Sequence, residues 1–357
     1  MNRISVFLLF GAIHSIWTWE NCVQPPMECP NENITFWLFT RATSEDDPHQ
    51  LLAQNSESIT SAPWVQGAPI KILIHGYTGH RDFSPNTEIR PAYMECCDYN
   101  VISVDYNPIA REPCYISAAH NIQLVGKCTA QLIDSLVQDH GFQLSKFHVI
   151  GFSLGGQTAG AISNYLQSGL LDRVSGLDPA MPLFVTSDKT KKLDSGDAKF
   201  VDVLHTNALE KGKLEQSGDI DFYANGGLTQ PGCFNQPNQT KSGCDHARAP
   251  AYYAESINTK IGFYGTQCLS WIAYMIGWCE FSGADEEVLF GEYVPTDASG
   301  LYFFQTNSKS PYAKGSNKNK QSPEPGYSSD NGLDDDDVYP YLYPPSTLEK
   351  MAQENIA

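Results

Sequence analysis

The sequence is short of positive charge. It has 23 Lys and Arg residues against 41 Asp and Glu residues, and its formal net charge at pH 7 is -18. Nucleic acids and anionic membranes attract cationic surfaces, so this balance excludes simple electrostatic capture by either of them. We therefore expect no nucleic-acid partner.

The sequence also has no internal repeat and, beyond its N-terminus, no long apolar run. The stretch 269–275 is apolar but too short to cross a bilayer, and Cys268 and Cys279 bracket it. We therefore expect no transmembrane segment, and repeat architectures are excluded.

What the N-terminus does contain is typical of secretion. Arg3 precedes an apolar run of about ten residues, the size of a signal-peptide core, so residues 1–18 are predicted to be a signal peptide whose cleavage point stays open. The chain has 10 cysteines and the sequons at Asn33 and Asn238. Both features favour an oxidising compartment, so we expect a secreted, extracellular glycoprotein with disulfide bonds.

The C-terminal residues 316–357 differ in composition from the rest. They are rich in Lys, Asn, Ser and Pro, then contain the acidic run 334–337 and several Tyr residues. Few apolar side chains together with a block of like charge predict disorder. The residues between the signal peptide and this tail, 19–315, are predicted to form one large α/β domain.

Five short apolar runs indicate the core of this domain. They are separated by helical stretches, of which 117–139 has an apolar side, and they lie at 69–75, 101–106, 147–152, 173–178 and 200–205. Strands that alternate with helices predict a mostly parallel sheet flanked by helices.

The run 147–152 leads into Gly151-Phe-Ser-Leu-Gly155, and a small-residue helix is expected after it. The order of strand, Gly-x-Ser-x-Gly and helix is that of a nucleophile elbow, which lifts a serine hydroxyl above the carboxyl end of a sheet. Ser153 is therefore the candidate nucleophile. The alternative is an ordinary turn from strand to helix.

A serine nucleophile needs a base, and the base needs an orienting carboxylate. Asp178 ends the run 173–178, and Pro179 prevents the strand from continuing, although an Asp in this position can also serve only as a turn residue. Two histidines follow. His205 lies inside an apolar alternating run and reads as a packed, hydrogen-bonded residue, whereas His246 lies in a cysteine-anchored loop. His246 is the predicted base.

Ester chemistry of this kind also needs two N–H groups that bind the developing oxyanion. One is expected from Leu154, directly after the nucleophile, and one from a loop after an early strand. The run 69–75 ends in His75-Gly-Tyr77, so Tyr77 is the second candidate, with a plain turn as the alternative.

Neighbouring cysteines suggest three local disulfides, and for these we expect the pairs Cys114–Cys128, Cys233–Cys244 and Cys268–Cys279. The spacing leaves the pairing of the other four open, and these are Cys22, Cys29, Cys96 and Cys97.

Together these motifs resemble the pancreatic lipase family, most closely its insect and venom branch that includes phospholipases A1. The likeness covers about residues 35–315 and rests on segments in order: 74–77, 151–155, 175–180, 200–206, 225–227 and 244–248. The resemblance implies an α/β-hydrolase fold. It also implies a triad of Ser153, Asp178 and His246 with Tyr77 and Leu154 as oxyanion amides, and neither a cofactor nor a catalytic metal.

The chain departs from the digestive lipases of that family in three respects. Phe152 stands where they carry His. The C-terminal β-sandwich domain is not expected, so neither is a colipase-type partner. The loop between Cys233 and Cys244, which the resemblance identifies as the lid, has only ten residues, with Phe234 as its one apolar side chain and a sequon at Asn238. One apolar side chain cannot form a lipid-facing helical stripe.

These features predict a secreted serine carboxylic ester hydrolase that acts on lipids at a lipid–water interface. Phospholipase A1 activity, which releases the sn-1 fatty acid, fits the short lid best. The alternatives are a triacylglycerol or galactolipid lipase, an esterase for soluble short esters, and a non-catalytic, yolk-protein-like lipid carrier.

Overall fold

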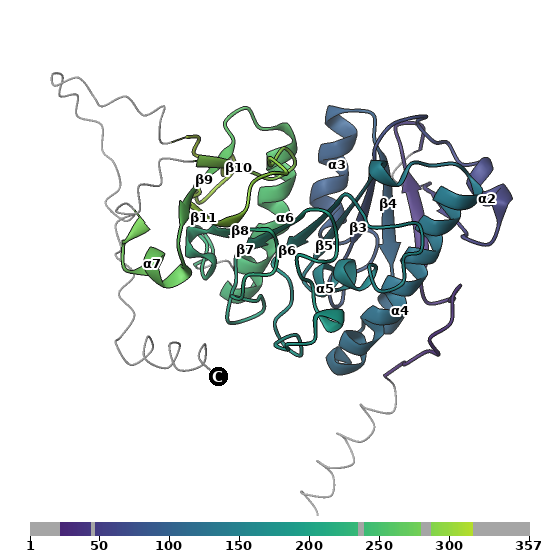
Figure 1. Cartoon of the computed structure of the whole chain (residues 1–357), viewed down its shortest axis with the longest axis horizontal. Coiled ribbons are helices and arrows are strands. Elements are labelled where there is room, and N and C mark those ends of the chain that lie inside the picture. The colour runs from purple at the N-terminus through teal and green to yellow at the C-terminus, as the bar shows by residue number, and fades with distance from the viewer. Residues whose placement is uncertain (1–21, 44–46, 235–238, 280–286, 317–357) are drawn as a thin grey trace, which may run out of the picture. The chain divides into compact units, whose positions relative to one another are not determined.

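The computed structural model describes residues 22–43, 47–234, 239–279 and 287–316 (Figure 1). The signal peptide expected at 1–18 lies outside these residues, and so does the expected tail apart from Ser316. Asn238, one of the two sequon residues, also lies outside them. These three expectations therefore stay predictions.

Within the described residues, eleven strands form one sheet in the order β10-β9-β11-β8-β7-β6-β5-β3-β4-β1-β2. Their bounds are β1 Thr35–Phe39, β2 His49–Leu51, β3 Ile70–Ile74, β4 Asn100–Asp105, β5 Phe147–Phe152, β6 Arg173–Leu177, β7 Val201–His205, β8 Ile220–Ala224, β9 Phe263–Cys268, β10 Glu287–Phe290 and β11 Gly300–Phe304. The seven strands from β4 to β11 in this order pair in parallel, and antiparallel strands extend both edges. The mostly parallel sheet is confirmed, and β3 to β7 are the five strands expected from the sequence.

Helices cover both faces of the sheet. They are α2 Ser56–Thr60, α3 Asn86–Cys96, α4 Tyr115–Asp134, α5 Leu154–Ala161, α6 Lys241–Asn258 and α7 Trp271–Met275. In Figure 1, α3 and α6 lie on one side of the central strands and α4 and α5 on the other. None of these helices of the described chain is both long and apolar enough to cross a membrane.

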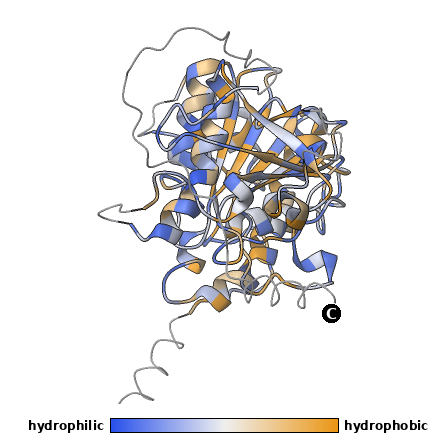
Figure 2. Ribbon diagram, turned by 90° about the vertical axis from the view of Figure 1, so that its left-hand side faces the viewer, coloured by the Kyte–Doolittle hydropathy of each residue, from blue (hydrophilic) through white to orange (hydrophobic). Residues whose placement is uncertain are grey.

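The central strands are apolar on both faces because helices pack on both. Ile72 and Ile74 of β3 belong to the core under α4 and α5, whereas Leu73 between them belongs to the core under α3 and α6. Figure 2 shows hydrophobic residues concentrated on the central strands. A strand buried on both faces has no polar side, which is why its sequence reads as a continuous apolar run.

The helix expected at 117–139 is present as α4 and one following π-helical turn, Ser135–Asp139. The expected Cys114–Cys128 disulfide is wrong. Fourteen residues along a helix correspond to a rise of about 20 Å, far beyond the Cα separation of about 5.5 Å in a disulfide. Cys114 instead bonds Cys22 and Cys128 bonds Cys29, which fastens the N-terminal segment along α4.

The disulfides Cys233–Cys244 and Cys268–Cys279 are present as the spacing predicts. The remaining two cysteines, Cys96 and Cys97, are bonded to each other at the end of α3. The partners of Cys22 and Cys29 could not be predicted from the sequence, because these disulfides span 92 and 99 residues.

Candidate active site

Ser153 occupies the turn between β5 and α5 in a backbone conformation that L-residues rarely adopt. Its φ is 56° and its ψ is −119°, and its N–H donates to the carbonyl of Leu177 at 2.9 Å. The flanking glycines are required here. A Cβ on Gly151 would lie 2.1 Å from the carbonyl oxygen of Gly155, and a Cβ on Gly155 would lie 2.2 Å from that of Ile74. The strained turn therefore lifts Ser153 out of the sheet. Only glycine fits at positions 151 and 155 on either side of it.

Asp178 follows β6 at the same carboxyl edge of the sheet. It is fully buried, and its φ of 43° turns the chain out of the strand. Its Oδ1 accepts hydrogen bonds from the N–H groups of Thr206 at 2.8 Å and Asn207 at 3.1 Å. Gly212 closes the pocket behind it, because a Cβ there would lie 2.3 Å from Oδ1. The carboxylate is therefore fixed by β7 and by the loop after it.

His246 brings its ring to the other carboxylate oxygen. Its Nδ1 lies 2.5 Å from Oδ2 of Asp178, and its ring packs on Phe152 with centroids 4.6 Å apart. The histidine does not lie in a loop, as the sequence suggested, but in α6, which begins where Thr240 Oγ1 accepts the N–H of Gly243. Thr240 is the N-cap of this helix, and a Thr is among the residue types preferred there.

Pro250 lies inside this helix, four residues after His246. A proline inside a helix lacks the N–H that would bond the carbonyl four residues earlier, which here is the carbonyl of His246. That carbonyl accepts a hydrogen bond from Thr206 Oγ1 at 3.5 Å instead. Thr206, the residue after β7, thus gives this carbonyl a long hydrogen bond in place of the helical one.

Ser153 and His246 line one cavity of about 850 Å³. Gly76, Tyr77 and Phe152 also line it, and Asp178 lies behind His246 without reaching the surface. Three residues that are far apart in the sequence are thus brought to the carboxyl ends of the adjacent parallel strands β5 and β6 and the helix facing them. The arrangement has the parts of an activated serine nucleophile.

The segment 75–77 passes close to the serine. A Cβ on Gly76 would lie 2.9 Å from Cβ of Ser153, so only glycine permits the approach. The buried His75 fixes this segment, since its Nε2 accepts the N–H of Tyr106 at 3.1 Å and its Nδ1 lies 2.8 Å from the carbonyl oxygen of Gly76. In a trans peptide the N–H points opposite to the carbonyl, so holding the Gly76 carbonyl also sets the direction of the Tyr77 N–H.

No hydrogen bond between described residues uses the N–H of Tyr77 or of Leu154. Leu154 is the first residue of α5, where the N–H groups have no partner within the helix. The Tyr77 ring meets Tyr115 edge-on at 5.1 Å. Burial raises the pKa of the Tyr77 hydroxyl, and the nearby Glu112 carboxylate raises it further, so this cavity wall is uncharged at Tyr77.

His205 has the structural role that its apolar strand suggested. It is fully buried in β7, with Nδ1 2.7 Å from the carbonyl oxygen of Lys213 and Nε2 2.9 Å from Oδ1 of Asp221. Its ring stacks on Tyr223 at 4.3 Å. Both nitrogens are therefore engaged away from the cavity that holds Ser153.

The short loop over the cavity is closed by Cys233–Cys244, with Cα atoms 5.5 Å apart. Phe234 is exposed, and Gln239 and Gly243 line the cavity. Lys241, Ser242 and Gly243 already belong to α6, so the part of the loop outside regular structure is shorter than its ten residues. Asn33, the described sequon residue, is half-buried, and its Nδ2 donates to Asn31.

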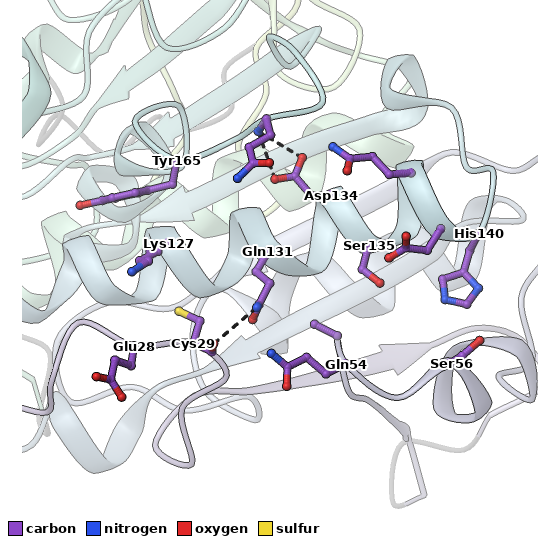
Figure 3. Close-up of a pocket in the computed structure, with 14 residues that line it drawn as sticks. Glu28, Cys29, Gln54, Ser56, Lys127, Gln131, Asp134, Ser135, His140 and Tyr165 are labelled. Atoms are coloured by element: carbon purple, nitrogen blue, oxygen red, sulfur yellow. Dashed lines mark hydrogen bonds between the residues drawn. The ribbon is translucent and has the colours of Figure 1, made fainter.

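A second, larger cavity of about 910 Å³ lies beside α4 (Figure 3). Its lining also includes two Asp, one His and two Ser residues, namely Asp134, Asp139, His140, Ser56 and Ser135. Asp134, however, accepts hydrogen bonds from the backbone of Gln167 and Ser168 rather than from a histidine. Between the described residues, no hydrogen bond or ion pair joins His140 to Asp134 or Asp139, so the carboxylate–imidazole pair of the first cavity has no counterpart among them.

A family model described as Lipase matches residues 17–312. The chain belongs to the lipase family. This lipase-family chain is 32% identical over 310 residues to pancreatic lipase-related protein 3 of Homo sapiens, and the match covers 79% of the chain and 65% of that relative. It is 29% identical over 307 residues to pancreatic triacylglycerol lipase of Mus musculus, again covering 79% of the chain and 65% of the relative. The resemblance to pancreatic lipases and the α/β-hydrolase fold are thereby confirmed, while the chain matches only about two thirds of these relatives' length.

Two groups that fix the site were not found from the sequence. Gly212 abuts Asp178 although 34 positions separate them along the chain, and no local pattern announces such a contact. The N–H groups of Thr206 and Asn207 follow directly after a strand that was expected. Parallel strands end at one edge, so these donors could have been found from the strand order.

Proposed function

We propose that this chain is a serine carboxylic ester hydrolase with Ser153 as nucleophile, His246 as base and Asp178 as orienting carboxylate. The observation that carries the proposal is the hydrogen-bonded pair of His246 Nδ1 and Asp178 Oδ2 behind a cavity that also holds Ser153. Because Asp178 engages Nδ1, Nε2 is the nitrogen left to accept the serine proton.

In the proposed reaction, Ser153 attacks the ester carbonyl and His246 takes its proton. The N–H groups of Tyr77 and Leu154 stabilise the oxyanion, at about 3 kcal/mol per donor by comparison with other hydrolases. His246 then protonates the leaving alcohol, and water releases the acyl group by the same steps. Asp178 holds the ring orientation and stabilises the imidazolium.

We propose a lipid ester as the substrate, since the relatives that match are named as pancreatic lipases. Among lipid esters we favour phospholipids, cleaved at sn-1. The short disulfide-closed loop has Phe234 as its one apolar side chain, and charged side chains are among those that line the cavity, namely Glu88, Glu112, Glu210 and Lys211. Charged groups in an otherwise largely apolar wall suit a polar headgroup beside acyl chains better than a third acyl chain. Triacylglycerol and galactolipid are the alternatives.

We further propose that the protein is secreted. Five disulfides are present in the described residues, and such bonds persist in oxidising compartments. Glycosylation at Asn33 and Asn238 belongs to the same proposal.

The test is a comparison of initial rates of the purified protein on phosphatidylcholine vesicles, galactolipid and triolein emulsions, with Ser153→Ala as control. Faster release of the sn-1 fatty acid from phosphatidylcholine than of fatty acid from triolein is expected. Faster cleavage of triolein would contradict the phospholipase proposal and would still agree with the proposal of a lipid ester hydrolase. The carrier alternative is separated by labelling with a fluorophosphonate, which should modify the protein but not the Ser153→Ala variant.

A further inference from the structure

The segment between Cys268 and Cys279 presents apolar side chains to solvent. Leu269 is 83% exposed, Ile272 52%, Ile276 48% and Trp278 64%. The disulfide closes the segment, with Cα atoms 5.0 Å apart. We call residues 268–279 the α7 loop. It lies at the end of the described sheet that carries β11 (Figure 1).

The inner side of the α7 loop is fixed to the fold. Trp271 is buried and its Nε1 donates to the carbonyl of Gly226 at 2.9 Å. Tyr274 stacks on Phe303 at 4.1 Å, and its hydroxyl accepts a hydrogen bond from Gln305 at 2.7 Å. With these side chains turned inward, the exposed residues form the opposite side of a rigid platform.

The stretch 261–279 contains no Asp, Glu, Lys, Arg or His, although 18% of the whole chain is Asp, Glu, Lys or Arg. An exposed surface without charge has no electrostatic preference for an anionic partner, and the net charge of -18 opposes anionic lipids. Tryptophan and large aliphatic residues together are typical of contact with the boundary between lipid headgroups and acyl chains.

The inner side of the α7 loop reaches the edge of the sheet where the candidate active site lies. Gly226 follows β8, and the carbonyl of the next residue, Gly227, accepts the N–H of Ala208 at 2.8 Å. Glu210, two residues further along, lines the catalytic cavity. Two hydrogen bonds, one from Trp271 to Gly226 and one from Ala208 to Gly227, thus connect the α7 loop to the segment that lines the cavity.

We infer that the α7 loop docks the protein onto zwitterionic lipid surfaces through Leu269, Ile272, Ile276 and Trp278. The inference rests on the proposed function, because a hydrolase of lipid esters meets its substrate at such a surface. A second copy of the chain fits less well. A stable dimer buries about 800 Å² per partner from 20 to 30 residues, more than this twelve-residue loop supplies.

The test measures binding of the full chain to sucrose-loaded phosphatidylcholine vesicles by sedimentation, with Ser153→Ala in every protein so that the vesicles stay intact. Adding Ile272→Ser and Trp278→Ser should weaken vesicle binding at least tenfold. Leu170→Ser is the matched control, since Leu170 is 41% exposed, precedes β6 and should leave binding unchanged. Leu269→Ser, outside the helix, provides a second variant if the double change impairs folding.

Vesicle binding that is unchanged in the Ile272→Ser, Trp278→Ser and Leu269→Ser proteins overturns the inference. So does a parent that elutes as a dimer while the variant elutes as a monomer with vesicle binding intact. The same changes on the Ser153 background should leave hydrolysis of a soluble short ester unaltered. Soluble-ester hydrolysis tests the proposed function by itself, so a protein without activity that still binds vesicles through the α7 loop separates the two proposals.

Discussion

Oδ2 of Asp178 lies 2.5 Å from Nδ1 of His246, although 68 positions separate the two residues in the chain. The other oxygen of the carboxylate accepts two backbone N–H groups from the loop after β7. Asp178 is therefore held from both sides, and the orientation of the imidazole follows from the parallel sheet rather than from the helix that carries it. Changes at this pair should alter catalysis more than stability.

Ser153→Ala should abolish ester hydrolysis while the protein still folds. The hydroxyl faces the cavity, so its removal leaves the core intact, whereas loss of the nucleophile should lower kcat/KM by about 10⁴-fold or more. Hydrolysis of a soluble ester and a thermal unfolding curve measure the two effects. Substantial turnover by the folded variant would mean that another residue is the nucleophile.

Replacing each of the two histidines by alanine should distinguish the catalytic base from the structural histidine. His246→Ala should match Ser153→Ala in rate, and the double variant should lose little more, because such residues act as a unit. His205→Ala should instead lower the free energy of unfolding by about 2–4 kcal/mol, since it removes the buried ring that bonds the Lys213 carbonyl and Asp221, and Asp221 then keeps only its two backbone N–H donors. The opposite pattern, with His205→Ala folded and inactive, would assign the base to His205.

Gly212→Ala should impair catalysis through Asp178, whose carboxylate supplies the three atoms nearest to the new Cβ. The new Cβ would lie 2.3 Å from a carboxylate that three hydrogen bonds hold in place, so the carboxylate must shift and carry the imidazole with it. A displacement of about 1 Å can cost about 10²-fold in rate. Gly196→Ala is the control, because its nearest neighbour is the side chain of Asp194 at 3.0 Å. Equal rates for the two variants would contradict the role of Gly212.

The turn that carries Ser153 could be predicted from the sequence because its requirements are local. The spacing Gly151-Phe-Ser-Leu-Gly155 describes a turn whose steric demands lie within five residues, and the structure has that turn. The strands β3 to β7 were equally visible, since burial on both faces requires continuous apolar runs. Strand β9 was not expected, because Gly265 and polar residues interrupt its pattern at an antiparallel edge.

The errors arose where contacts are distant or where a local signal misleads. Cys114 and Cys128 are near in sequence, but a straight helix keeps them apart, and their partners come from the N-terminal segment. Pro250 argues against a helix at His246, yet Thr206 compensates for the missing hydrogen bond. The contact of Gly212 with Asp178 depends on the loop after β7 and could not be read from either residue.

Asp197 should make the stability of the protein depend on pH. Burial raises the pKa of its carboxyl to about 7, while hydrogen bonds from Ser163 and the N–H of Asp194 lower it in part. An unfolded Asp ionises near pH 3.9, so between about pH 4 and pH 7 the unfolded state has released this proton and the folded state still holds it. The free energy of unfolding should therefore fall as the pH rises through this window, by at most roughly 4 kcal/mol from this group.

Asp197→Asn should remove that dependence. The amide can accept the N–H of Asp194 through its oxygen and donate to Ser163 Oγ, which still donates to the carbonyl of Gly160 at 2.8 Å. The variant should therefore unfold at a higher denaturant concentration than the parent at pH 8 and at a similar one at pH 4. Asp188→Asn is the control, because Asp188 is only partly buried and its pKa is lowered by Thr190 and Lys191, which gives the opposite sign. A parent and an Asp197→Asn variant whose stabilities run parallel from pH 4 to pH 8 would show that Asp197 ionises normally in the folded protein.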